Sequence, residues 1–289
     1  VQAWVTVPVE PLLTKRSQVQ EWNAADLLHA VVDPQKPAAP YAVLLINTPI
    51  PPQLRQAFER LWQNATLRVC ADGAGNRLYD EFGEDYLPKL KLPDWIVGDL
   101  DSIRPEVCSY FQSKVIDCTE VKTVSDREGI GAEKETIQYS TDLQKSIQAI
   151  EDAEAAAQIP HLQLVFFGGL TGRLDHTAHT LHVMWQLAPN VPMDNVIAEP
   201  PEPGSTEPPR GSALAKRDRT LVVSDQCVAW VLPKVSSFCV APAYVYQGEH
   251  ILYHDRTYLG KTCSLLPFGS GRDELHVHTE GLEWNLRTS

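Results

Sequence analysis

Apolar runs alternate with segments of helical periodicity over the central part of the chain. Residues 41–46 form a continuous apolar run, which indicates a buried strand. The segment after it places apolar residues at the spacing of one helix face, at Leu54, Phe58, Leu61 and Trp62. Further strands are predicted at residues 67–71, 95–97, 114–118 and 162–167. Strands that alternate with helices predict an α/β fold with a parallel sheet covered on both faces.

The rest of the chain differs from this central part in composition. Residues 1–40 carry scattered apolar residues and are predicted to be an extension, which leaves residues 41–191 as the α/β domain. Residues 192–219 include five prolines between positions 200 and 209, which predicts a linker or insertion. From residue 220 to 289 short apolar segments separated by turns predict a smaller all-β sandwich domain.

Charge and cysteine content narrow the set of partners. The net charge is −12 and no long Lys/Arg run is present, so we expect no nucleic acid and no anionic membrane as partner. No run of 18 apolar residues occurs. The six cysteines lack the spacing of a zinc site, which predicts reduced thiols in a cytoplasmic protein.

A pair of carboxylates follows the predicted strand at residues 95–97. Asp99 and Asp101 are two positions apart, so in extended backbone their side chains point the same way. Mg²⁺ prefers oxygen ligands, with one or two carboxylates and the remaining positions filled by water and phosphates. An isolated pair of this kind is more often a solvated acidic turn, and only the neighbouring motifs favour a metal site.

A turn rich in small residues follows the strand predicted at residues 67–71. It places Asp72 at the carboxyl end of that strand and then begins a helix. The free N–H groups of such a helix start bind anions. Taken alone, the turn is equally typical of an ordinary βα connection with an Asp cap.

A second turn, Gly-Gly-Leu-Thr-Gly-Arg, follows the strand predicted at residues 162–167. Its glycines, Gly168, Gly169 and Gly172, let backbone amides approach phosphate oxygens closely. Arg173 adds a fork of donors that suits phosphate. The turn therefore predicts a phosphate-binding loop ahead of a helix.

Two helix segments carry further polar candidates. Ser140 or Thr141 is predicted to cap a helix that runs to about residue 157, with Asp142 in its first turn. The segment alone favours Asp142 as a residue matched to the helix dipole. His176 and His179 recur with His182 on the helix after the glycine turn, and without a Glu at H-E-x-x-H spacing they favour a half-exposed helix face over a metal site.

Together the four motifs resemble the thiamin pyrophosphokinase family. The A-D-G-x-x-N-R-L, G-D-x-D-S, T-D-x-x-K and G-G-L-x-G-R-x-D patterns occur here in that order, and residues 264–269 and 281–286 resemble segments of the family's second domain. The resemblance implies a Rossmann-like ATP-binding catalytic domain, a β-sandwich that helps to bind thiamin, and a homodimer. It implies the reaction of ATP with thiamin to give AMP and thiamin diphosphate.

The resemblance also assigns roles to residues. Asp99, Asp101 and Asp142 would hold Mg²⁺ against the triphosphate, with Asp72 nearby as a ligand or an acceptor, and this set would be catalytic. The other positions that match the family and would contact ATP or thiamin are Asn76, Gln138, Thr141, Lys145, Gly168, Gly169, Gly172, Arg173, Asp175 and Trp284. Trp284 is equally typical of a core residue and of a side chain that stacks on the thiazolium ring.

Two other functions stay open on the sequence alone. A nucleotide-sugar transferase would use the Asp99-Leu100-Asp101 segment for its metal but would leave the other motifs unused. A non-catalytic nucleotide-sensing module would keep nucleotide binding without turnover. The family's second domain normally continues beyond the Gly281–Leu286 segment, so we expect part of the thiamin site to lie beyond residue 289 and thiamin binding by this chain to be reduced.

Overall fold

The computed structural model describes residues 2–6, 19–23, 39–114, 122–124, 141–189, 214–217, 219–232, 249–253, 262–266 and 278–285. The chain divides into two compact units, one of residues 39–231 and one that joins residues 1–38 to residues 232–289. Each unit is described by itself below. Among the described helices, none combines the length and apolarity that crossing a bilayer requires.

The larger unit is built on a seven-stranded sheet in the order β6-β5-β4-β3-β7-β8-β9. All neighbouring strands are parallel except β8 and β9, which are antiparallel. The strands are β3 (Tyr41–Leu45), β4 (Leu67–Ala71), β5 (Trp95–Val97), β6 (Lys122–Val124), β7 (Gln163–Phe167), β8 (Thr220–Val223) and β9 (Val228–Trp230). The predicted α/β class with a parallel sheet is thereby confirmed.

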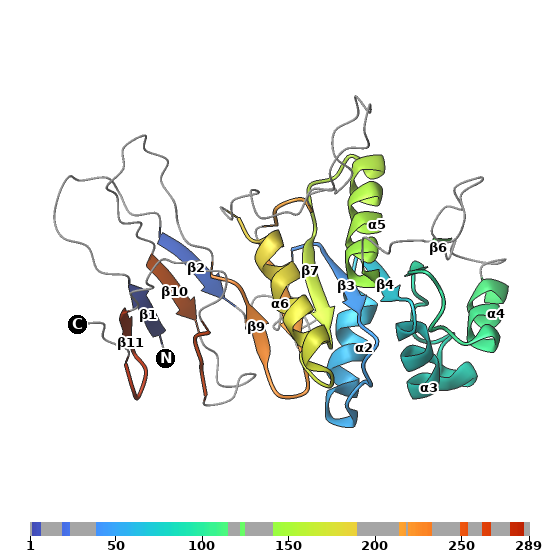
Figure 1. Cartoon of the computed structure of the whole chain (residues 1–289), viewed down its shortest axis with the longest axis horizontal. Helices are drawn as coiled ribbons and strands as arrows, with labels where there is room; N and C mark the ends of the chain where they lie inside the picture. The colour runs from blue at the N-terminus through green and yellow to red at the C-terminus, as the bar shows by residue number, and fades with distance from the viewer. Residues whose placement is uncertain are drawn as a thin grey trace. The chain divides into compact units, whose positions relative to one another are not determined.

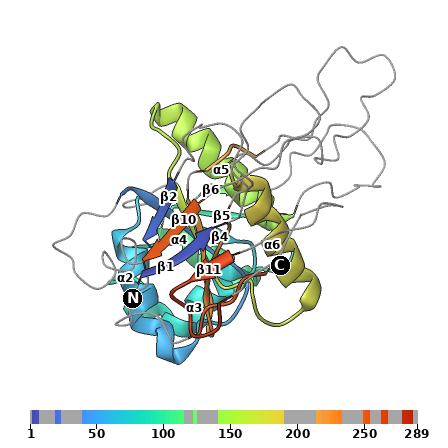
Figure 2. The ribbon, with the colours of Figure 1, turned by 90° about the vertical axis from the view of Figure 1, so that its left-hand side faces the viewer.

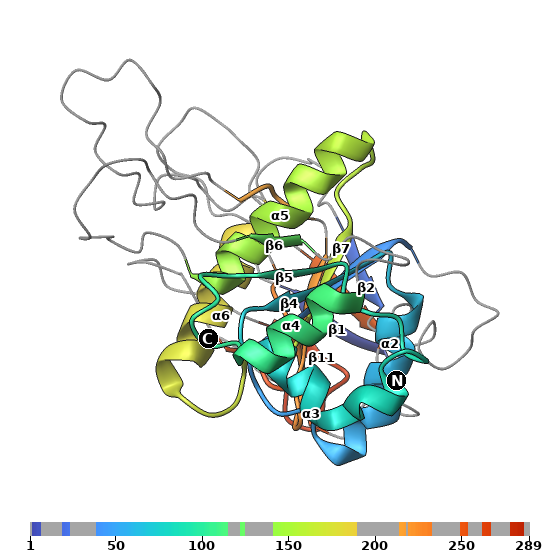
Figure 3. The same ribbon diagram turned by 90° about the vertical axis from the view of Figure 1, so that its right-hand side faces the viewer.

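Helices cover both faces of this sheet (Figure 1). They are the 3₁₀ turn η1 (Pro52–Leu54) and the α-helices α2 (Arg55–Asn64), α3 (Ala74–Tyr86), α4 (Pro105–Lys114), α5 (Asp142–Ala157) and α6 (Leu174–Leu187). On one face α5 and α6 pack through residues such as Ile147 and Val183 on Leu44 and Phe166. On the other face Phe58 of α2 contacts Phe82 of α3 and Phe167 of β7. Figure 3 shows α5 passing over β4 and β5.

The strand order creates a switch point between β3 and β7. The chain proceeds from β3 outward through β4 to β6, then returns to place β7 on the other side of β3. The helices that follow β3 and β7, α2 and α6, therefore cover opposite faces of the sheet. In open parallel sheets ligands bind at the carboxyl ends of the strands near such a point.

The smaller unit contains a four-stranded sheet in the order β11-β1-β10-β2 (Figure 2). Its strands are β1 (Gln2–Thr6), β2 (Val19–Asn23), β10 (Glu249–Tyr253) and β11 (His278–Glu280). β1 pairs antiparallel with β10 and β11, and β10 pairs parallel with β2. The prediction that residues 1–40 are a separate extension is therefore wrong, because β1 and β2 supply half of this sheet. A sandwich with a second sheet stays a prediction.

Two further boundaries differ from those predicted. β8 and β9 were expected in the all-β domain but complete the parallel sheet, because β8 pairs in register with β7. The local sequence pattern of a short apolar strand does not indicate which sheet the strand will join, so it could not assign β8 and β9 to the parallel sheet. The predicted strand at residues 114–118 lies mostly outside the described residues, and Lys114 belongs to α4. Most of the predicted insertion at 192–219 also lies outside the described residues.

Candidate active site

Three carboxylates meet at the carboxyl ends of β4 and β5. Asp72 follows β4, and Asp99 and Asp101 lie in the loop after β5. Each offers an oxygen, and the three oxygens lie within 4.8 Å of one another. Asp72 is buried whereas Asp101 is exposed, so the cluster opens from the sheet toward solvent. Hard oxygen donors at this separation fit Mg²⁺.

Asp72 holds the neighbouring loop as well as facing the cluster. Its carboxylate accepts hydrogen bonds from the backbone N–H of Ser102 at 3.0 Å and of Ile103 at 3.1 Å. The residue has a positive φ of 40°, an uncommon conformation that these bonds help to maintain. Burial raises the pKa of Asp72, and the two N–H donors oppose this shift only in part.

The loop after β5 turns tightly around its own carboxylates. The backbone N–H of Asp101 donates to Asp99 Oδ1 at 3.3 Å, and Ser102 Oγ donates to Asp101 Oδ1 at 2.7 Å. Leu100, between the two acidic residues, has a φ of 61°. The hydrogen bond from Ser102 lowers the pKa of Asp101, so this carboxylate is ionised at neutral pH.

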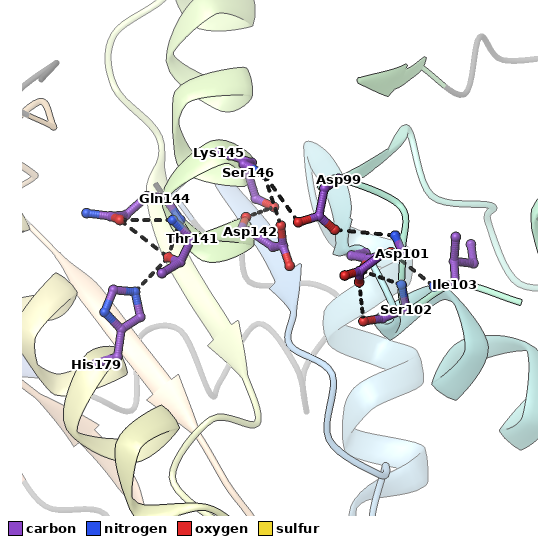
Figure 4. Close-up of polar contacts among 11 residues, drawn as sticks. Asp99, Asp101, Ser102, Ile103, Thr141, Asp142, Gln144, Lys145, Ser146 and His179 are labelled. Atoms are coloured by element: carbon purple, nitrogen blue, oxygen red, sulfur yellow. Dashed lines mark hydrogen bonds and ion pairs between the residues drawn. The ribbon is translucent and has the colours of Figure 1, made fainter. Parts of the chain in front are cut away.

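The first turn of α5 brings a fourth carboxylate and a lysine to the cluster (Figure 4). Lys145 Nζ lies 3.5 Å from Asp142 Oδ1 and 3.8 Å from Asp99 Oδ2. Asp142 Oδ1 is buried and accepts no hydrogen bond among the described residues. Burial and the charge of Asp99 raise the pKa of Asp142, and the charge of Lys145 offsets only part of this rise. The site thus carries carboxylates with pKa values shifted in opposite directions, a pattern that marks functional sites.

The glycine turn after β7 requires glycine at each of its predicted positions. Gly168, Gly169 and Gly172 have φ values of 93°, 86° and 89°. A Cβ added at Gly168 would also collide with Thr48 of the loop after β3, so the two loops at the switch point pack closely. The N–H of Gly168 donates to the carbonyl of Val223 at 2.8 Å, so contacts to phosphate oxygens would fall to the later amides of the turn.

Arg173 ends the glycine turn and pairs with Asp175 of the next helix. Its guanidinium donates to both carboxylate oxygens of Asp175, at 3.1 and 2.6 Å. Both side chains are well exposed, so the pair can exchange for another anion at little cost.

Comparison with known proteins supports the reading of these motifs. The sequence model of the thiamin pyrophosphokinase catalytic domain matches residues 58–193. Thiamine pyrophosphokinase 2 of Oryza sativa subsp. japonica is 29% identical over 257 residues, covering 86% of this chain and 74% of that protein. Thiamine pyrophosphokinase of Saccharomyces cerevisiae is 23% identical over 304 residues, covering 92% of this chain and 78% of the yeast protein. The chain is similar to thiamin pyrophosphokinases over most of its length.

A solved structure of the thiamin pyrophosphokinase family also matches. The crystal structure of the yeast enzyme gives a TM-score of 0.42 at 23% identity and covers 63% of this chain. The match spans 65% of that chain, slightly under two thirds of its length. The segment that matches the family's catalytic domain contains Asp72, Asp99, Asp101 and Asp142 and the whole glycine turn.

Some residues assigned from the thiamin pyrophosphokinase resemblance lie elsewhere or serve another contact. Asn76 donates to the carbonyl of Ser102 at 2.8 Å and accepts from the N–H of Arg104 at 3.0 Å, so its amide holds the loop after β5. Gln138 lies outside the described residues. Trp284 belongs to the smaller unit and is 83% exposed, which contradicts a core position. A ligand contact of Asn76 or Trp284 stays a prediction.

The sequence pattern missed two features of the thiamin pyrophosphokinase site. The loop after β3 contributes Asn47, whose side-chain oxygen accepts from Arg77 Nε at 2.9 Å. The signal that could have identified Asn47 is its place just after the strand predicted at residues 41–46, since ligands bind at such strand ends. His179 lies on the expected half-exposed helix face, and its ring contacts Thr141, a bond that no sequence spacing indicates.

Proposed function

We propose that this chain transfers the pyrophosphoryl group of ATP to the hydroxyl of thiamin, giving AMP and thiamin diphosphate, with Mg²⁺ at the acidic cluster. The similarity to thiamin pyrophosphokinases supports the enzyme class. The observation that supports catalysis at this site is that Asp72, Asp99 and Asp101 lie close together at one edge of the parallel sheet. The glycine turn lies at the carboxyl end of another strand of the same sheet.

The acidic cluster fits a divalent cation by its donor set. Three carboxylate oxygens within 4.8 Å of one another, one of them on a buried residue, repel each other unless a cation or protons compensate. Asp72, Asp99 and Asp101 would hold Mg²⁺. Asp142, which is expected from the sequence as a ligand in place of Asp72, is not among these three carboxylates and would face the ion from α5. When bound, Mg²⁺ neutralises charge on the transferring phosphates.

The remaining groups bind and orient the substrates. The amides of the turn after Gly168 would bind phosphate oxygens, and Arg173 would exchange its exposed partner Asp175 for a phosphate. The side chain of Lys145 is only 11% exposed, and its positive charge between Asp99 and Asp142 offsets part of the repulsion between the two carboxylates. Transfer of this kind needs mainly positioning and electrostatic stabilisation.

The hydroxyl of thiamin attacks the β-phosphorus, and the bond from that phosphorus to the oxygen of AMP breaks. A carboxylate of the cluster accepts the hydroxyl proton. Asp142 is the candidate, because it is not among the three carboxylates of the proposed metal site and burial raises its pKa.

The smaller unit would contribute to the thiamin site, as the family resemblance implies. The exposed indole of Trp284 is available to stack on an aromatic cation. We also propose a homodimer and a cytoplasmic location. Free thiols at Cys70, Cys108, Cys227 and Cys263 agree with a reducing compartment.

A turnover experiment tests this function. The protein is incubated with Mg²⁺, ATP and thiamin, and AMP and thiamin diphosphate are measured by chromatography. Formation of both in equal amounts, abolished by EDTA and restored by Mg²⁺, supports the proposal. Nucleotide binding without turnover would favour a sensing module. Turnover of a sugar nucleotide without AMP formation would favour a transferase.

A further inference from the structure

Helix α6 contacts both halves of the site. Midway along α6, buried Thr180 packs against the glycine turn so closely that a Cβ at Gly169 would lie 2.9 Å from Thr180 Oγ1. One residue earlier, His179 Nε2 lies 2.7 Å from Oγ1 of Thr141, the N-cap of α5 (Figure 4). Adjacent residues of one helix therefore join the phosphate-binding turn to the start of the helix that carries Asp142 and Lys145.

The contact with His179 is the shortest one that Thr141 Oγ1 makes. The same hydroxyl caps α5 by accepting from the N–H of Gln144 at 3.4 Å, and it lies 3.4 Å from Gln144 Oε1. A hydroxyl has one proton to donate and two lone pairs. With one lone pair used for the cap, the imidazole at 2.7 Å fixes how the hydroxyl is turned and where the cap lies.

We propose that His179 is a positioning residue of the thiamin pyrophosphokinase reaction, which acts through Thr141 to hold Asp142 and Lys145 in register with the glycine turn. The inference rests on the proposed function. Apolar packing by itself does not give this register. Core residues such as Leu143 and Met184 join α5 and α6 over the sheet, but apolar contacts are not directional, whereas a hydrogen bond at the N-cap is.

The test compares three single variants. His179→Ala removes the contact. His179→Gln offers an amide that can restore it. His182→Ala is the matched control, because His182 lies one turn further along α6, where its ring stacks on Trp185 instead of reaching α5. All three are measured for melting temperature, for turnover with Mg²⁺, ATP and thiamin, and for hydrogen exchange of the ligand-free protein.

Hydrogen exchange reports the coupling without any ligand. The N–H of Gln144 bonds to Thr141 Oγ1 and that of Lys145 to the Thr141 carbonyl at 2.9 Å, so both amides report on the cap. We expect His179→Ala to speed their exchange at least about fivefold, as local opening becomes easier, while His182→Ala leaves it unchanged. Unchanged exchange in His179→Ala would overturn the proposal even if the protein proves to have another activity.

Turnover then separates positioning from direct contact. His179→Ala should lower kcat at least about tenfold, because small misplacements of catalytic groups are costly, and His179→Gln should recover most of this loss. In a Thr141→Val background His179→Ala should have little further effect. An undiminished loss in that background would show that His179 acts without Thr141 and would overturn the proposal. If the parent protein forms no thiamin diphosphate, the proposed function fails while the exchange result still stands.

Discussion

Gly98 lies against Asp142 at the edge of the acidic cluster. A Cβ added at Gly98 would lie 3.1 Å from Asp142 Oδ1 and 2.6 Å from Asp72 Cβ. The absence of a side chain at residue 98 therefore lets a carboxylate from β4 and one from α5 approach the end of β5. The glycine of the Gly-Asp-Leu-Asp-Ser motif is required by close approach, since its φ is not among the positive values of the described residues.

Replacing Gly98 by alanine should thus damage the site directly. The methyl group would displace Asp72 or Asp142, and overpacking of this kind costs about 1–3 kcal/mol of stability. We expect Gly98→Ala to raise the Mg²⁺ concentration for half-maximal turnover at least about tenfold, since each 1.4 kcal/mol corresponds to a factor of ten. Magnesium titration of turnover together with thermal melting measures both effects. A variant with normal Mg²⁺ dependence would contradict the close packing of the cluster.

The three clustered aspartates should separate into two classes on substitution. Asp99→Asn and Asp101→Asn are expected to reduce turnover at least about a hundredfold with the fold intact, because loss of a metal ligand removes several kcal/mol of transition-state stabilisation. Near-normal rates of both variants at saturating Mg²⁺ would refute the metal assignment.

Asp72→Asn is the informative contrast. Its carboxylate accepts from Ser102 and Ile103 through separate oxygens, and an amide has one oxygen and one NH₂ group. One backbone N–H would then face a donor, which costs about 1–3 kcal/mol. We expect this variant to lose stability in urea unfolding as well as activity, whereas Asp101→Asn loses activity alone.

The acidic cluster could be predicted from the sequence because each of its residues is identified by the segment next to it. Asp72, Asp99 and Asp101 each follow a predicted parallel strand, and the carboxyl ends of such strands meet at one edge. The contact between His179 and Thr141 could not be predicted from the sequence, because it depends on how α5 and α6 pack on the sheet. Nor could the sequence pattern place β1 and β2, whose partners β10 and β11 lie more than two hundred residues away in the chain.

The Pro-rich segment allows a separate test of the domain boundaries. Residues 200–209 carry few apolar groups, and a change in loop length costs little entropy. We expect their removal to lower the melting temperature by less than about 5 °C. Leu214→Ala, just beyond the segment, should lower it more, because Leu214 is buried in the core with α5 and α6. A larger fall on deletion than on Leu214→Ala would contradict the interpretation as an insertion.

A buried ion pair between Glu154 and Arg217 joins α5 to the segment that leads into β8. The two side chains are 1% and 0% exposed, and Glu154 also accepts from the N–H of Leu162 at 2.8 Å and contacts His161. Burial raises the pKa of Glu154, but the hydrogen bonds from Arg217, His161 and Leu162 outweigh it, so the net pKa lies below the ordinary value.

This lowered pKa predicts how stability depends on pH. Because the ionised form of Glu154 is favoured in the folded state, its contribution is complete above the ordinary pKa of 4.5 and is lost as pH falls through the lower folded value. Glu154→Gln should cost about 3 kcal/mol near neutral pH, since Arg217 loses the nearer of its two counter-charges and keeps only Glu151, whose Oε1 lies 3.7 Å from Arg217 Nη2. Below pH 4.5 the difference between parent and variant should shrink. Urea unfolding from pH 3 to pH 7 measures it, with Glu106→Gln as a control at an exposed pair with Arg104. A difference that stays constant over this range would show that the charge of Glu154 contributes nothing to stability.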